Sequence, residues 1–106
     1  MNIRTQRKFE ARAQILKAMA HPTRLFIINA LVEEECCVCE LTDMVGADIS
    51  TVSKHLSVLK NAGIVQDDKR GLQVYYSLRC PCILDFLGCI ENVIKENLKG
   101  QMEVAR

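Results

Sequence analysis

The sequence predicts a mainly α-helical domain with one two-stranded β-hairpin, in which a helix-turn-helix is followed directly by the hairpin as a wing. Three observations support this fold class. Apolar residues repeat at helical spacing in several segments, Gly46 divides two of these segments by a short turn, and a strand-forming pattern rich in Val and Tyr comes next.

Length and composition favour one globular domain, residues 1–106. Apolar residues make up 49% and charged residues 25% of the chain, which is typical of a folded, water-exposed protein. The polar, basic N-terminus does not resemble a secretion signal, and no apolar run approaches the roughly 18 residues of a membrane span. We therefore expect a cytoplasmic protein with no membrane contact.

The first three helices are predicted from their apolar spacing and their ends. The first helix ends near His21-Pro22, since a residue before proline disfavours helical geometry, and Pro22 suits the first turn of the second helix, which runs to about Glu33. A short third helix ends at Gly46. The apolar positions of the first and third helices are Phe9, Ala13, Leu16 and Ala20, and Leu41, Met44 and Val45.

The segment DISTVSKHLSVLKNAG predicts the fourth helix, capped by Asp48 or Ser50 and closed at Asn61-Ala62-Gly63. Its expected buried stripe is Ile49, Val52, Leu56 and Leu59. A hairpin then runs from Ile64 to Leu78 with its turn at Lys69-Arg70-Gly71. Pro81 is expected to open a long last helix, which Gly100 ends.

In a helix-turn-helix, the second helix enters the major groove of DNA, so the polar face of the fourth helix is the candidate reading surface. Small hydroxyl side chains allow close approach to bases, and lysines neutralise phosphates. No acidic residue lies between Ser50 and Ala62, although an ordinary solvated face would explain any single polar residue. The predicted DNA-binding residues are Ser50, Thr51, Ser53, Lys54, His55, Ser57 and Lys60 on the helix, with Lys69 and Arg70 at the hairpin tip.

The net charge of +1 hides a segregation along the chain. Residues 1–24 carry +5, residues 25–49 carry −6 with no Lys or Arg, and residues 50–70 carry +2. The overall charge does not indicate a nucleic-acid partner, but the basic blocks permit one.

Four stretches, HPTRLFII, CVCEL, STVSKHLSVLKNAGIV and RGLQVYYSL, together resemble the ArsR/SmtB family of winged-helix repressors over roughly residues 18–78. The resemblance implies a homodimer joined by the first and last helices. It also implies binding to double-stranded operator DNA at an inverted repeat, and release when an inducer binds. No cofactor is expected for DNA binding, and no enzymatic activity.

Six cysteines in a chain without an export signal point to metal or redox chemistry. Five are candidate ligands: Cys36, Cys37, Cys39, Cys80 and Cys82. Residues two apart on an ideal helix point about 200° away from each other, so Cys37 and Cys39 can share an ion only where the helix is unformed or distorted. The acidic block favours a cation there but raises thiol pKa values. Cys89, among apolar residues, is expected in the core.

The arsenic-sensing members of the resembled family carry Cys-x-Cys in the third helix, with another Cys three residues on. Cys37 and Cys39 match the pair, but Thr42 stands at the third position. The resemblance therefore implies As(III) or Sb(III) as inducer, with the third sulfur left open between Cys36, Cys80 and Cys82.

Several alternatives remain at this point. Soft thiolates also suit cadmium, lead, zinc or copper(I), and an iron–sulfur cluster is a further possibility. A thiol redox or sulfide switch would join Cys37 or Cys39 to Cys80 or Cys82, as the resemblance suggests. A zinc site on the last helix is disfavoured because that helix has no histidine. A small thiol oxidoreductase using Cys36-x-x-Cys39 is disfavoured because a helix, not a strand, precedes the motif.

Overall fold

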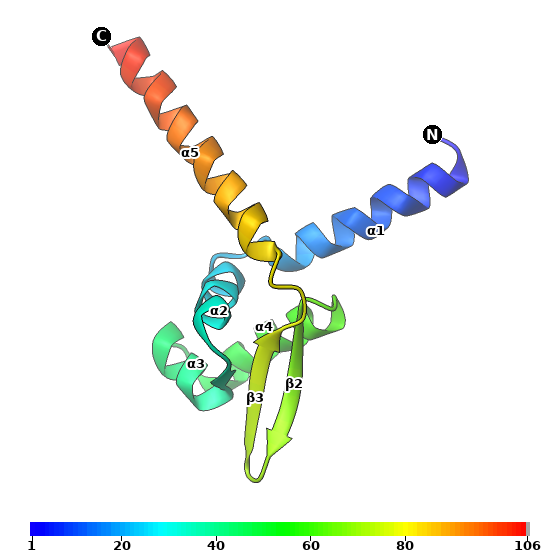
Figure 1. The fold of residues 1–106 in the computed structure, drawn as a ribbon, viewed down its shortest axis with the longest axis vertical. Helices are drawn as coiled ribbons and strands as arrows, with labels where there is room; N and C mark the ends of the chain where they lie inside the picture. The colour runs from blue at the N-terminus through cyan, green and yellow to red at the C-terminus, as the bar shows by residue number, and fades with distance from the viewer. Residues whose placement is uncertain (106) are drawn as a thin grey trace.

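The computed structural model describes residues 1–105 and has the predicted winged helix-turn-helix architecture (Figure 1). The helices are α1 (Ile3–Met19), α2 (Pro22–Glu33), α3 (Val38–Val45), α4 (Ile49–Asn61) and α5 (Ile83–Ala105). The strands are β1 (Cys36–Cys37), β2 (Val65–Arg70) and β3 (Gln73–Leu78). The fold class is confirmed, and the two-residue strand β1 is an element that the sequence did not predict.

The wing is the outer part of a three-stranded antiparallel sheet with the order β1-β3-β2. Cys36 pairs with Tyr76 and Cys37 with Tyr75, so the cysteine segment forms the third strand beside the hairpin. The hairpin turn lies at Gly71-Leu72, where Gly71 adopts a left-handed φ of 62°. The expected turn at 69–71 was therefore placed too early, because Lys69 and Arg70 still pair within β2.

The core lies where α2, α3 and α4 pack beneath the sheet. Its fully buried side chains are Ile27, Ile28, Leu41, Val52, Leu56, Leu59 and Val65. Ile49 was wrongly expected in this core: it is 59% exposed. The reason is local, since Asp48 caps α4 by accepting from the Thr51 N–H at 2.7 Å, which leaves Ile49 at the first helical position, ahead of the buried stripe.

The turn between α3 and α4 is set by Gly46. This residue adopts a left-handed φ of 76°, and its N–H donates to the Thr42 carbonyl at 2.9 Å. Left-handed geometry costs other residues about 1–2 kcal/mol, so glycine suits this helix end. The cap at Asp48 follows two residues later, and α4 is thereby fixed relative to α3.

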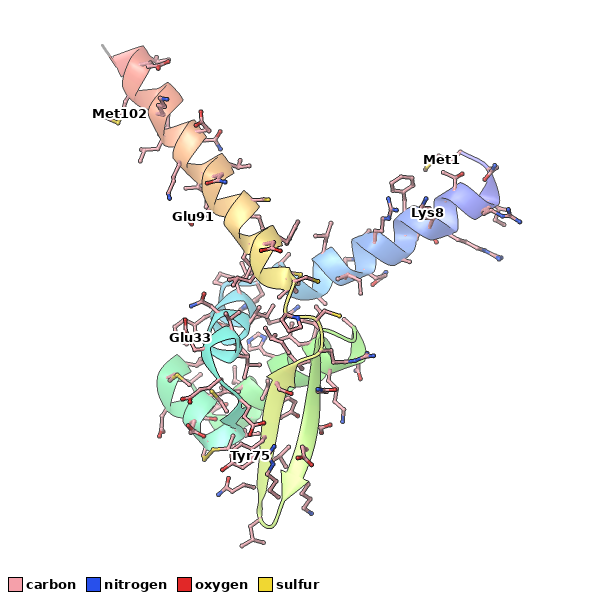
Figure 2. The ribbon with its side chains drawn as sticks, viewed as in Figure 1. Met1, Lys8, Glu33, Tyr75, Glu91 and Met102 are labelled. Carbon is pink, nitrogen blue, oxygen red and sulfur yellow. A yellow bond between two sulfur atoms is a disulfide. The ribbon has the colours of Figure 1, made fainter. Side chains whose placement is uncertain are left out.

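Helices α1 and α5 project away from this body in different directions (Figure 1). The radius of gyration is 16.8 Å, whereas a compact chain of about 100 residues has about 13 Å. Large apolar side chains on both helices are exposed, among them Ile3, Phe9 and Leu16 on α1, and Phe86, Ile90, Val93, Ile94 and Leu98 on α5. Figure 2 shows side chains standing out along the length of both helices, with Lys8 labelled on α1 and Glu91 and Met102 on α5.

The ends of α5 differ from expectation. The helix begins at Ile83 after a turn in which the Leu84 N–H donates to the Pro81 carbonyl, and it continues through Gly100 to Ala105. A glycine inside a helix costs only about 0.5–1 kcal/mol, so Gly100 does not end it.

In residues 1–105 no single helix is long and apolar enough to cross a membrane; only α1 and α2 together, bent by 87°, satisfy the length and composition criteria.

Candidate functional site

The outer face of α4 presents a row of short hydroxyl side chains and two lysines, Lys54 and Lys60, to solvent. Val52, Leu56 and Leu59 point into the core, which turns the opposite face outward. Ser53, Lys54 and Ser57 are exposed on it, as are Ser50 and Thr51 in the first turn. The Ser50 hydroxyl donates to Asp48 at 3.0 Å, so this hydroxyl is held by the helix cap.

His55 is the member of the predicted DNA-binding set that the structure turns inward. It is half-buried, its ring lies 4.4 Å from that of His21, and its Nδ1 accepts from Arg24 Nε at 3.2 Å. Burial and the neighbouring His21 and Arg24 lower the pKa of His55. Arg24 also donates to the Ala18 carbonyl at 3.0 Å, so one guanidinium joins α1, α2 and α4.

Two of the predicted phosphate contacts are engaged in ion pairs within the chain. Lys60 Nζ lies 2.9 Å from Asp67 Oδ2, across the junction of α4 and β2. Arg70 contacts both oxygens of the Glu35 carboxylate, with 3.0 Å from Nη2 to Oε2, and its Nε donates to Asp68 at 2.9 Å. Its guanidinium also stacks over the Tyr75 ring at 4.7 Å. Lys54 and Lys69 have exposed side chains.

Cys37 and Cys39 lie side by side at the start of α3, and the structure joins their sulfurs in a disulfide with 5.4 Å between the Cα atoms. This is possible because Cys37 is not helical. It is the extended N-cap residue of α3, and only Cys39 lies in the helix. The two sulfurs can share one partner only if the two cysteines are not both helical. Cys37 meets this requirement because it precedes α3, so α3 does not have to unwind.

The sulfur of Cys37 also has a structural role. It accepts from the Glu40 N–H at 3.4 Å, while the Glu40 carboxylate accepts from the Cys37 N–H at 3.1 Å, a reciprocal capping box. Cys39 is exposed, with its Sγ 3.6 Å from Gln73 Oε1 at the start of β3. The pair is thus in contact with both α3 and the wing.

Cys36 and Thr42 do not complete the pair. Cys36 belongs to the hydrophobic core, and its thiol donates to the Glu34 carbonyl at 3.5 Å; burial, and then the nearby Glu40, Glu34 and Glu35, raise its pKa. The Thr42 hydroxyl donates to the Val38 carbonyl at 2.8 Å. Among residues 1–105, no three Cys, His, Asp or Glu side chains converge to hold a metal ion.

The downstream cysteines lie at the other end of the sheet. Cys37 pairs with Tyr75, and Cys80 follows Tyr75 by five positions, two beyond the end of β3, which is about 16 Å if the chain keeps strand spacing. Cys80 and Cys82 are exposed, and within one chain this spacing prevents either from bonding to Cys37 or sharing an ion with it. Cys89 was wrongly expected in the core: it is exposed on α5, because nothing in the described chain packs over that helix face.

Comparison with known proteins identifies this arrangement. Residues 21–67 match the model of bacterial regulatory proteins of the arsR family. An HTH-type transcriptional regulator of Methanocaldococcus jannaschii, MJ1325, is 43% identical over 70 residues, covering 65% of this chain and 79% of that protein. The chain belongs to the arsR family.

Two further proteins that are similar to this chain bear on the site. The cadmium resistance transcriptional regulatory protein CadC of Lactococcus lactis is 39% identical over 72 residues, covering 67% of this chain and 60% of CadC. The solution structure of a homodimeric winged helix-turn-helix DNA-binding domain, Mb0332 of Mycobacterium bovis, matches with a TM-score of 0.81 at 25% identity, covering 94% of this chain and 93% of that domain.

Membership of the arsR family makes the chain a transcriptional regulator and not an enzyme. The thiol oxidoreductase interpretation of Cys36-x-x-Cys39 is excluded on this ground. The position of Cys36 supports this exclusion. Cys36, the first cysteine of the motif, is buried and hydrogen-bonded, whereas a reactive cysteine has to be accessible.

Three residues of this arsR-family site were missed from sequence: Arg24, Glu35 and Gln73. Each contacts its partner across 31 to 35 positions of the chain, Arg24 with His55, Glu35 with Arg70 and Gln73 with Cys39. No local pattern announces such a pairing. The one available signal was the acidic run that precedes the cysteines, opposite the basic hairpin.

Proposed function

We propose that this arsR-family protein is a homodimeric repressor that binds double-stranded operator DNA and leaves it when an inducer engages Cys37 and Cys39. The observation that supports the proposal best is the position of the two sulfurs. They lie together where α3 begins, one capping that helix and the other touching the wing.

The DNA-reading surface in this proposal is the outer face of α4. Ser53, Lys54 and Ser57 are exposed on the helix that follows the turn, which is the one that enters the major groove in this motif. Lys69 near the wing tip adds a second basic contact. Lys60 and Arg70 contribute only after leaving Asp67 and Glu35.

The homodimer in this proposal forms through α1 and α5. Both helices expose apolar side chains that one protomer cannot cover, such as Phe9 at 49% and Val93 at 58%. Exposed apolar surface of this extent marks an interaction site. The domain Mb0332, which has the same fold, is homodimeric.

As(III) or Sb(III) is the inducer that we favour. With the disulfide reduced, Cys37 and Cys39 offer two adjacent soft donors, and soft thiolates select thiophilic ions. The pair supplies two donors only, so a third would come from outside this cluster. An ion bound at Cys37 Sγ would act on the residue that caps α3, and α3 packs on α4 through the buried Leu41.

Cadmium is the alternative ion, since a cadmium resistance regulator is among the relatives. Lead, zinc and copper(I) suit the same two thiolates.

A redox switch is a second candidate function, and the Cys37–Cys39 disulfide favours it. A peroxide would take two electrons and two protons from the thiols, joining the sulfurs while being reduced to water. In this switch Cys37 and Cys39 bond to each other, and neither bonds to Cys80 or Cys82.

A gel shift with reduced protein and an inverted-repeat DNA duplex tests these proposals. Arsenite, antimonite, cadmium, zinc and a mild peroxide are compared side by side. We expect arsenite and antimonite to release the DNA at the lowest concentrations. Release by peroxide alone would support the redox switch, and release by cadmium alone would support the metal alternative. Failure to bind any inverted-repeat DNA would overturn the repressor.

A further inference from the structure

The wing and the sensing segment are linked by one ion pair whose geometry suggests a role in DNA binding. Arg70 near the wing tip contacts both oxygens of Glu35, which lies immediately before β1. The two residues are separated by 35 positions and lie on opposite sides of β3. A second side-chain contact, between Cys39 and Gln73, also joins these two segments, but it is uncharged. The contact of Arg70 with Glu35 joins opposite charges.

All three nitrogens of the Arg70 guanidinium are occupied. Nη1 and Nη2 contact Glu35, and Nε contacts Asp68. The forked contact to Glu35 has the same two-point geometry with which arginine binds a phosphate. Two carboxylates around one guanidinium leave the group with net negative charge, which opposes the approach of DNA to the wing.

We propose that Glu35 acts as an internal phosphate mimic, a latch that competes with a backbone phosphate for Arg70 and keeps Arg70 off DNA in most of the wild-type complexes. This inference rests on the proposed function, because it needs the wing to face DNA. Both side chains are nearly half exposed, with relative exposures of 47% and 45%, so a phosphate can reach Arg70 without unfolding the wing. Asp68, on the same strand as Arg70, keeps the Nε edge in place during the exchange.

Glu35→Gln tests the latch, and Glu34→Gln is its matched control. Glu34 is the preceding exposed acid, so both substitutions remove one negative charge from the same segment. We expect Glu35→Gln to tighten operator binding by about two- to fivefold, the range of an exposed ion pair. The salt dependence of binding should steepen by about one phosphate contact. Glu34→Gln should change binding less and leave the salt slope unaltered.

The double variant Glu35→Gln with Arg70→Ala separates the latch from general repulsion. If Arg70 makes the new phosphate contact, the double variant loses the gain in affinity and the extra salt slope. Equal behaviour of Glu35→Gln and Glu34→Gln would overturn the latch, as would a gain that survives in the double variant, or weaker binding by Glu35→Gln. In each of those cases the wild-type protein still binds operator, whereas loss of binding by every protein would instead overturn the proposed function.

Discussion

Cys37 and Tyr75 face one another in the antiparallel pairing of β1 with β3. Tyr75 also lies beneath the guanidinium of Arg70, so the sensing pair, the wing strand and the wing tip form one continuous structural unit. A change at the sulfurs therefore has two directions in which to act. One leads through the cap of α3 toward α4, and the other through the sheet to the wing.

The first prediction concerns the sulfurs. Cys37→Ser and Cys39→Ser should each abolish release by arsenite while leaving operator affinity within about twofold of wild type. Serine is a good N-cap residue, so Cys37→Ser keeps the cap of α3 that the sulfur provides. Titration of arsenite in a gel shift measures the response. Cys89→Ser is the control, because that thiol is exposed on α5, outside the pair, and its variant should respond normally.

Lysines on α4 should differ according to their partners. Lys54→Ala should weaken operator binding and lower the salt slope by about one, because its exposed ammonium neutralises a phosphate. Lys60→Ala should have a smaller effect on both, since Lys60 is already paired with Asp67 at 2.9 Å. Fluorescence anisotropy at several salt concentrations gives both quantities. An unchanged slope for Lys54→Ala would remove that residue from the interface.

Core packing of α4 gives a stability prediction. Leu56 is fully buried, and Leu56→Ala should lower the free energy of unfolding by about 2–5 kcal/mol. Val58 lies two positions away and is 37% exposed, so Val58→Ala should lower it by much less, within about 1 kcal/mol. Urea unfolding at one fixed protein concentration measures both. Similar losses for the two variants would contradict the placement of the α4 core face.

The His55 site predicts a pH dependence of stability. Burial, His21 and Arg24 lower the pKa of His55 in the folded chain, so the unfolded chain takes up its proton first as pH falls. The free energy of unfolding should therefore decline as pH drops below about 6.5, the ordinary histidine value, and level off below the lowered pKa. Protonation also places a hydrogen on Nδ1, which then no longer accepts from Arg24.

Unfolding by urea between pH 8 and pH 5 checks this dependence. His55→Gln is the comparison variant, because its amide oxygen accepts from Arg24 but does not titrate in this range. Its stability should fall less with acid than that of the wild type. A decline of equal size in both proteins would assign the effect to other groups.

Sequence patterns were sufficient for the elements with repeating apolar spacing. Val52, Leu56 and Leu59 identified the buried face of α4, and Gly46 identified the turn before it. Strand β1 was not predictable from sequence. Its two residues are too few to show the alternation of apolar and polar side chains that marks a strand, and its partner β3 begins 36 positions after Cys37. For the same reason the sequence left Cys80 and Cys82 as candidate partners of Cys37, whereas pairing along β3 separates them.

The polar site was predicted less completely than the fold. An exposed helix face can be read from periodicity, but ion pairs depend on which segments meet. His55, Lys60 and Arg70 were therefore all assigned to DNA, while each has a partner elsewhere in the chain. Lys54 differs, because its surroundings are set by α4 alone. Helical periodicity assigned it to the DNA-facing surface of α4, and its side chain is exposed there.

The uncovered apolar faces of α1 and α5 have a consequence for gene dosage. If protomers pair through these faces and most are unpaired at low expression, the concentration of the DNA-competent dimer rises with the square of the protomer concentration by mass action. A modest fall in expression would release the operator without any inducer. The number of protein copies in a cell would thus set the threshold at which an inducer is needed.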